Sequence, residues 1–377
     1  MAICRTGRLM TARALATICR ALCVALLCAI TVTSARAAQD QSGPELRLTR
    51  EIWLDTARQR HVNVRIALPP RGSVQTQGAM PVALFSAPQG FRWGGHVDGY
   101  EPLAEMLLKR GVVLVMVFHY DLHEQMGTNE RFAEIYPGIQ TGKRNDAPVD
   151  RFEDCLYVLD KLSKFNVERR DGWPTLDLSK LAVIGHSSGT LTAMHMSGLP
   201  VRDRDGKVFT VHRDPRIKAF VVYSYPFEYS APGRADVKQV GAVAGLHVAG
   251  TEDHPDYRNS AFRYVEGAPQ YWLVAKGDHS VGLFGSEALI LQVTGDFIDT
   301  YLNGKAAARG RLSLETLRSH RPALKQFLEK PPSAWPRLDQ RDFAAWARES
   351  LPWGKTLHTR AIAYQRNTER TKDRPAK

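Results

Sequence analysis

The sequence predicts an α/β protein with a mostly parallel central sheet that helices cover on both faces. Short runs of apolar residues alternate along the chain with segments whose apolar residues recur every three or four positions. The runs are apolar throughout, as expected for parallel strands that are buried on both faces. With 377 residues, of which 44% are hydrophobic, the chain is long enough to build a large core.

The elements are expected in a fixed order. Residues 45–55 and 60–69 alternate apolar and polar side chains, which predicts an antiparallel hairpin at one edge of the sheet. Buried strands are expected at 82–87, 112–118, 181–186, 217–225, 246–251 and 270–277. Helices are expected at 102–110, 152–165, 187–198 and 287–302, and a surface hairpin at 201–216.

The ends of the chain differ from this pattern. Residues 1–37 join a basic leader, an apolar run and the small-residue site Ala35-Arg36-Ala37, which predicts a secretory signal peptide and export to the periplasm or beyond the cell. The run is short for a membrane span, so an uncleaved anchor is the weaker alternative. The α/β domain is expected at 38–312, a helical extension at 313–359 and a basic, disordered tail at 360–377.

Loss of the signal peptide changes the cysteine and charge counts. Four of the five cysteines leave with it, and Cys155 remains in a helical segment among apolar neighbours, which predicts a packing role. The formal net charge falls from +12 to +7. Much of that charge lies in the final tail, and no basic helix with stacking aromatics suggests a nucleic-acid partner.

Residues 185–189 carry the first chemical signal, Gly-His-Ser-Ser-Gly, which fits G-x-S-x-G with Ser187 in the centre. An apolar strand precedes this stretch and a helical segment follows it. On such a sharp turn the serine is held in strained geometry, and the flanking glycines let strand and helix approach closely. The setting predicts that Ser187 is a nucleophile at a helix N-terminus.

An orienting acid and a general base are expected after the nucleophile, in that order. Asp253 follows the strand at 246–251 with G-x-x-D spacing, although Glu252 and Asp256 compete for the role. His279 follows the last strand in Gly277-Asp278-His279. Both lie at strand ends, where open α/β sheets build their sites. His279 is therefore the expected base and Asp253 the acid that orients it.

The oxyanion hole is expected to use the backbone N–H groups of Phe91 and Ser188, because one donor comes from the loop after the first buried strand and one from the residue after the nucleophile. Gln89, Phe91, Trp93, His96 and Tyr100 are expected to border the acyl pocket, and Tyr120 is expected to contact the substrate.

Two histidines around an acid, His119, Asp121 and His123, also invite a zinc interpretation. A tetrahedral site needs further ligands that the sequence does not provide, so a cleft-lining role is favoured and no metal is expected.

The chain resembles the α/β-hydrolase superfamily, and within it the secreted dienelactone-hydrolase-like and platelet-activating-factor-acetylhydrolase-like serine esterases. The stretches that carry the likeness are FSAPQGFRWGG, LDLSKLAVIGHSSGTLTAM, DPRIKAFVVYS, LHVAGTED and AKGDHSVGLFG, within residues 45–312. The resemblance implies a cofactor-free catalytic domain at 38–312, with the triad Ser187, Asp253 and His279. One departure is Gln89-Gly90, where relatives have His-Gly.

These patterns favour an exported serine hydrolase that cleaves carboxylic esters, either small molecules or polymers, through an acyl-enzyme. An acyltransferase or a peptidase would use the same triad. A non-catalytic binding protein on a hydrolase scaffold is the alternative from another class. The sequence leaves open the acyl group, the role of the extension and the oligomeric state.

Overall fold

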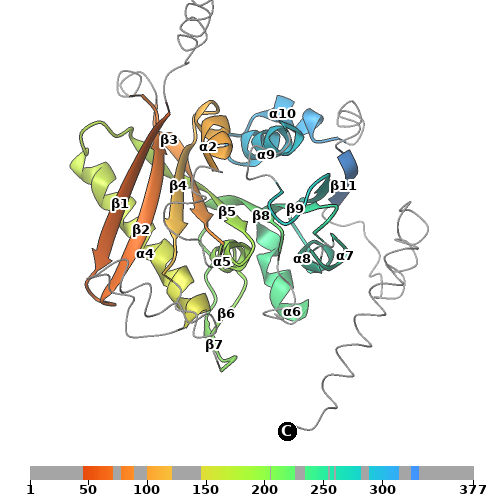
Figure 1. Ribbon diagram of the computed structural model, residues 1–377, viewed down its shortest axis with the longest axis horizontal. Coiled ribbons are helices and arrows are strands. Elements are labelled where there is room, and N and C mark those ends of the chain that lie inside the picture. Colours follow the sequence, from red (N-terminus) through yellow and green to blue (C-terminus); the bar gives the residue numbers. More distant parts are fainter. Residues whose placement is uncertain are drawn as a thin grey trace, which may run out of the picture.

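The protein was analysed as a computed structural model (Figure 1), which describes residues 46–70, 78–88, 100–120, 146–203, 205–225, 234–253, 255–258, 260–281, 288–313 and 324–330. The predicted signal peptide, the final tail and most of the predicted extension lie outside these ranges. Among the helices in these ranges, none is both long and apolar enough to cross a membrane.

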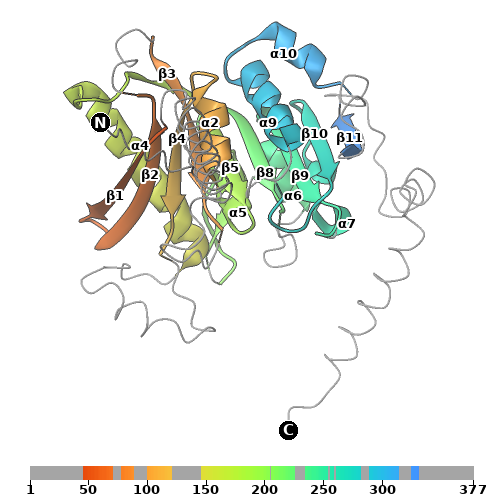
Figure 2. The same cartoon turned by 45° about the horizontal axis from the view of Figure 1, so that its top comes forward.

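One mixed sheet organises the described chain, and Figure 2 shows it running from β1 at one edge to β11 at the other. Its strands, in spatial order, are β1 (Arg47–Asp55), β2 (Arg60–Leu68), β4 (Val113–Phe118), β3 (Met80–Ser86), β5 (Leu176–His186), β8 (Ile217–Tyr223), β9 (Ala244–Gly250), β10 (Gln270–Ala275) and β11 (Leu324–Lys330). Strands β4, β3, β5, β8, β9 and β10 run parallel to one another. Strand β2 is antiparallel to both β1 and β4, and β11 is antiparallel to β10.

Helices connect these strands and cover both faces. The described helices are α2 (Glu101–Leu108), α4 (Ala147–Glu168), α5 (Gly189–Met196), α6 (Arg234–Val237), the 3₁₀ helix η5 (Lys238–Ala242), α7 (Pro255–Arg258), α8 (Ser260–Tyr264), α9 (Ala288–Tyr301) and α10 (Ala306–Arg311). A small hairpin of β6 (Val201–Arg202) and β7 (Val208–Thr210) projects beyond the sheet near one end of α4 (Figure 1).

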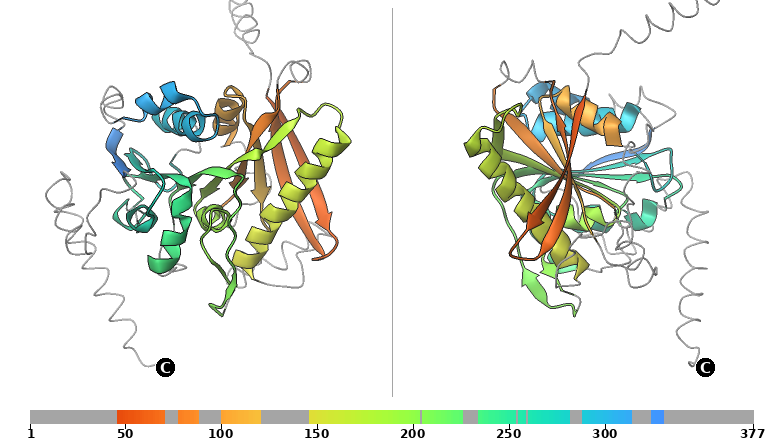
Figure 3. Two further views of the ribbon diagram at one scale, coloured as in Figure 1. Left: turned by 180° about the vertical axis from the view of Figure 1, so that it is seen from behind. Right: turned by 60° about the vertical axis from the view of Figure 1, so that its left-hand side comes forward.

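Two hydrophobic cores lie on opposite faces of the sheet. Strand β4 shows the division, because Leu114 and Met116 pack with α2 and α9, whereas Val113 and Val115 pack with α4 and α5. Figure 3 shows α4 across one side of the twisted sheet and α2 and α9 on the other. This two-faced burial explains why the parallel strands are apolar throughout.

The architecture confirms the expected order of strands and helices and is compatible with an α/β-hydrolase-like fold. Helix α4 begins earlier than expected, because Asp146 accepts a hydrogen bond from Val149 N at 3.4 Å and Pro148 occupies the first turn. Cys155 is buried, as predicted, and burial raises the pKa of its thiol.

The prediction for the C-terminal extension was wrong in one place. Residues 324–330 form strand β11 rather than a helix. Their apolar residues Leu324, Phe327 and Leu328 have helical spacing, but the open edge of β10 offers backbone groups that this segment satisfies as a strand. Edge pairing thus overrides the local pattern.

Candidate functional site

Ser187 lies on the tight turn that joins β5 to α5. Its φ angle is 52°, in the left-handed region that residues other than glycine rarely adopt. Its N–H donates to the carbonyl of Tyr223 at 2.9 Å, and its own carbonyl accepts from Thr190 N at 3.0 Å and from the Thr190 hydroxyl at 2.5 Å. The neighbouring strand and the first turn of the helix together hold the strained conformation.

The glycines on either side of Ser187 are required by space. A Cβ atom at Gly185 would overlap the backbone of Gly189 and Thr190. A Cβ atom at Gly189 would overlap the carbonyl of Ser86 at the end of β3. The physical basis predicted for the G-x-S-x-G pattern, close approach of strand and helix, is therefore present here.

Asp253 and His279 meet at the same edge of the sheet. Asp253 follows β9, His279 follows β10, and Nδ1 of His279 lies 2.9 Å from Oδ1 of Asp253. Because an ionised carboxylate only accepts hydrogen bonds, Nδ1 carries the proton and Nε2 is left as the basic nitrogen. The Asp253 side chain is buried, whereas 44% of the His279 side chain is exposed and accessible to a ligand.

The two loops that carry these residues are joined by backbone contacts. Glu252 N donates to Gly277 O at 2.8 Å, and Thr251 N donates to Ala275 O at 2.9 Å. A side chain at Gly250 would overlap the carbonyls of Gly277 and Asp278. The glycine of the G-x-x-D pattern thus allows the approach that brings acid and base together.

Arg258, at the end of α7, is a charged neighbour that sequence reasoning missed. Its Nη2 atom donates to Asp253 Oδ1 at 3.0 Å and lies 3.4 Å from Nδ1 of His279. Its remaining donors reach the carbonyls of Asp253 and Tyr225, each at 3.2 Å. Nothing in the local pattern around residue 258 indicated this contact, because it depends on how the loop after β9 folds back.

The electrostatics of the site favour an ionised acid. Burial on its own would raise the pKa of Asp253. The hydrogen bond from His279, the polar Ser224 side chain nearby and the charge of Arg258 outweigh that effect and leave the pKa of Asp253 below its usual value. The carboxylate therefore stays charged near neutral pH and can orient the imidazole.

The turn that carries Ser187 and the loop that carries His279 lie side by side. The rings of His186 and His279 have centroids 5.2 Å apart, and His186 immediately precedes Ser187. Within the described part of the chain, no hydrogen bond joins the Ser187 hydroxyl to His279. Contacts between a nucleophile and its base are often long in the free protein and shorten when substrate binds.

The predicted oxyanion and pocket residues are placed only in part. Ser188 precedes the first residue of α5, where helical N–H groups lack carbonyl partners within the helix. Tyr120 is buried just after β4. Gln89, Phe91, Trp93 and His96 lie outside the described residues, as do Asp121 and His123.

Tyr100 is not where it was expected. It is fully buried, and its ring packs against Phe85 with centroids 4.6 Å apart. Tyr100 starts the helical turn that leads into α2, so its ring belongs to the core between that helix and the sheet rather than to a pocket.

His119 also has a different role from cleft lining. Its Nε2 atom lies 2.9 Å from the Ser86 hydroxyl, and its Nδ1 atom lies 3.0 Å from Oδ2 of Asp154 on α4. Its side chain is fully buried. Both ring nitrogens are thus engaged by protein groups, which leaves neither for a zinc ion. We call Ser86, His119 and Asp154 the buried Ser–His–Asp chain.

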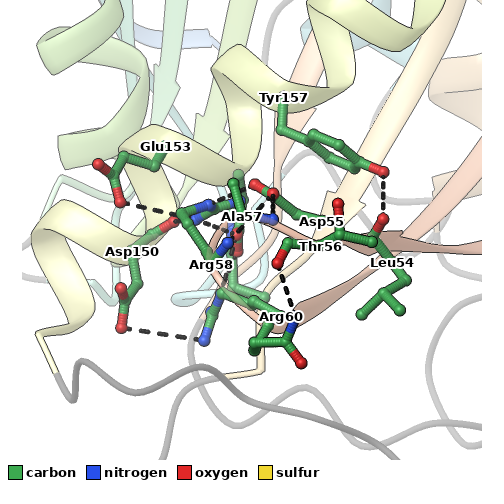
Figure 4. A network of polar contacts seen from close by, with 12 residues as sticks. Leu54, Asp55, Thr56, Ala57, Arg58, Arg60, Asp150, Glu153 and Tyr157 are labelled. Carbon is green, nitrogen blue, oxygen red and sulfur yellow. Dashed lines mark hydrogen bonds and ion pairs between the residues drawn. The ribbon is translucent and has the colours of Figure 1, made fainter.

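Arginines complete this buried chain. Arg60 Nε donates to Asp154 Oδ1 at 2.8 Å, and Arg58 Nη1 lies 3.0 Å from the same oxygen. Figure 4 shows Arg58 and Arg60 reaching from the β1–β2 hairpin towards Asp150 and Glu153 on α4. The network ties the edge hairpin to α4, and through His119 to the ends of β3 and β4.

Neither a family model nor a curated protein sequence matches this chain. Its function is therefore inferred from the site itself.

Proposed function

We propose that the protein is an exported serine hydrolase of the α/β-hydrolase superfamily, in its dienelactone-hydrolase-like and platelet-activating-factor-acetylhydrolase-like branch, and that it cleaves carboxylic esters. The observation that carries the proposal is the contact between His279 and Asp253, next to a serine held at positive φ on a strand–helix turn. A residue in such a conformation is costly to maintain, and functional sites are where strain of this kind gathers.

The chemistry proceeds in two halves. The Ser187 hydroxyl attacks the ester carbonyl carbon while its proton passes to Nε2 of His279. The C–O bond to the alcohol breaks, the alcohol leaves with that proton, and an ester of Ser187 remains. Water then attacks this acyl-enzyme with His279 again taking the proton, and the carboxylic acid departs as Ser187 is restored.

Charge development explains the other assignments. Asp253 stabilises the imidazolium that forms in each half, and its lowered pKa keeps it ionised for that purpose. The negative charge on the carbonyl oxygen would be met by the N–H of Ser188 and by the predicted donor Phe91. No cofactor or metal is needed for these steps.

A fluorophosphonate probe tests the proposal. We expect it to modify the mature protein and not the Ser187→Ala variant, because the probe requires an activated serine. Equal modification of both proteins would refute Ser187 as the nucleophile.

The substrate class follows from the aromatic residues predicted around the site. Trp93 and Tyr120 favour apolar or aromatic acyl groups, including fragments of polyesters. A series of p-nitrophenyl esters of increasing acyl length, measured with Ser187→Ala as the blank, would define the preference. Dominant transfer to an added alcohol, rather than hydrolysis, would instead identify an acyltransferase.

A further inference from the structure

The backbone carbonyl of His279 is held by two side chains from neighbouring strand ends. His186 Nε2 lies 2.8 Å from this oxygen, and the Ser224 hydroxyl donates to it at 3.0 Å. A carbonyl accepts only, so Nε2 of His186 carries the proton. These contacts connect the loop of His279 to the proposed nucleophile, because His186 directly precedes Ser187 in the chain.

Ser224 is itself held in an uncommon conformation. It directly follows β8, its φ angle is 58°, and its N–H donates to the carbonyl of Val248 in β9 at 2.8 Å. Positive φ therefore occurs at the ends of two adjacent strands, at Ser187 after β5 and at Ser224 after β8. Ser224 donates to the His279 carbonyl, and Ser187 directly follows His186, which contacts the same oxygen.

Histidine at position 186 is energetically unfavourable if its only described role is to donate one hydrogen bond. It is buried, and burial lowers the pKa of its imidazole to about 4, so the ring is neutral near pH 7. Its Nδ1 atom is buried without a hydrogen-bond partner among the described residues. A buried acceptor left unsatisfied costs about 1–3 kcal/mol, which an apolar side chain would avoid.

We infer that His186 and Ser224 are positioning residues, which fix the loop bearing His279 relative to the turn bearing Ser187. The inference deepens the proposed function and rests on it. Neither residue touches the reacting atoms in this scheme. They act by holding the main chain of the base, while Asp253 holds its ring from the other side. Base and nucleophile are thus linked through one residue, the x of the G-x-S-x-G pattern.

A pair of matched variants at His186 tests the inference. His186→Leu removes the donor at similar volume, and His186→Gln keeps an N–H donor of similar reach. Misplacement of a catalytic group by about 1 Å can cost about 100-fold in rate. We expect kcat for p-nitrophenyl butyrate to fall about 10- to 100-fold in His186→Leu with KM changed less than about threefold, and to recover most of the way in His186→Gln.

Ser224→Gly provides a second variant if His186→Leu fails to fold. Glycine tolerates the positive φ and removes only the hydroxymethyl group, so we expect a smaller fall in kcat, about 3- to 10-fold. Amide exchange of residues 277–281, followed by mass spectrometry, should become faster in His186→Leu and Ser224→Gly and stay near wild type in His186→Gln. This readout does not depend on catalysis.

The outcomes separate the two claims. If Ser187→Ala hydrolyses the ester as well as wild type, the proposed function fails. If Ser187→Ala is inactive but His186→Leu and Ser224→Gly retain wild-type kcat and amide exchange, the positioning role is overturned alone. Equal losses in His186→Leu and His186→Gln would also overturn it, because they would show that the donor N–H is not what matters.

Discussion

The molecule contains two Ser–His–Asp groups that use the same residue types in opposite ways. In the buried chain, Ser86, His119 and Asp154 are joined by hydrogen bonds of 2.9 and 3.0 Å, and the imidazole has no exposure. In the proposed site the His279 ring is 44% exposed and Ser187 is strained. The two groups come close at Gly189, where any side chain would overlap the carbonyl of Ser86.

Hydrogen-bonded geometry does not by itself identify a catalytic serine. By distances alone, the buried chain is the more complete of the two. It lacks an exposed base, because Arg60 and Arg58 surround Asp154 and both nitrogens of His119 are occupied. Access for a substrate and stored strain favour Ser187, and the satisfied network suits Ser86 to a structural role.

The largest difference is expected between alanine variants of the two serines. Ser187→Ala should lower the rate of ester hydrolysis by at least about 1,000-fold, because the proposed nucleophile is lost. Ser86→Ala should change the rate less than about tenfold and instead lower stability, because it leaves a buried imidazole nitrogen without its partner. Steady-state hydrolysis and chemical unfolding would measure activity and stability in both variants. A lower activity in Ser86→Ala than in Ser187→Ala would contradict the assignment.

The two aspartates should differ in the same sense. Burial would raise the pKa of Asp154, but Arg60 and His119 outweigh it and hold that pKa far below its usual range. Asp154→Asn removes the nearest carboxylate of the buried Arg60, which then has Asp150 at 3.8 Å, and should cost about 3–5 kcal/mol of unfolding free energy. Asp253→Asn should instead lower kcat by about 10³- to 10⁴-fold, because the amide favours the wrong tautomer of His279. Denaturant titrations and kcat should be measured for both variants. Similar losses of stability and of kcat in the two variants would contradict the expected difference.

Mild acid should lower the free energy of unfolding through His186, whereas the contribution of the buried Ser–His–Asp chain should persist. The folded-state pKa of His186 is depressed to about 4, against about 6.5 when unfolded. Above pH 6.5 the ring is neutral in both states and has no effect. Below it only the unfolded chain takes up the proton, so stability falls by about 3 kcal/mol on reaching pH 4. Asp154 stays ionised over this range, so its stabilisation persists.

Unfolding free energies at pH 7 and pH 4 check this in wild type and His186→Gln. The variant should lose about 3 kcal/mol less than wild type over the interval. His195 on α5, whose pKa burial also lowers to about 4, should contribute equally in both proteins and provides an internal reference. Parallel pH curves for the two proteins would show that His186 is not titrating in this way.

The smallest effect concerns the contact between the two regions. Gly189→Ala should destabilise the fold by about 1–3 kcal/mol, because the new methyl group must displace the end of β3 or the start of α5. Gly310→Ala is a matched control, since a Cβ atom there meets nothing within 4 Å. Thermal unfolding would give the melting temperatures of both variants. Equal values would argue against a close approach between Gly189 and the end of β3.

Much of the fold was predictable from the sequence, because strands buried on both faces have to be apolar throughout and their helices keep a regular period. The positions of Ser187, Asp253 and His279 were also predictable, since each follows a strand that ends at the same edge. The partners of His119 were not, because Ser86 and Asp154 lie far from it in sequence and meet only through packing. Arg258 and strand β11 were missed for the same reason: tertiary contacts decide their placement.

Mapping a covalent adduct would show whether Ser187 or Ser86 is the reactive serine. The mature protein would be treated with a fluorophosphonate, digested and sequenced by mass spectrometry. We expect a single phosphonylated serine at position 187, and none after the same treatment of Ser187→Ala. An adduct at Ser86, or the absence of any adduct from a folded wild-type protein, would show that Ser187 is not the reactive serine.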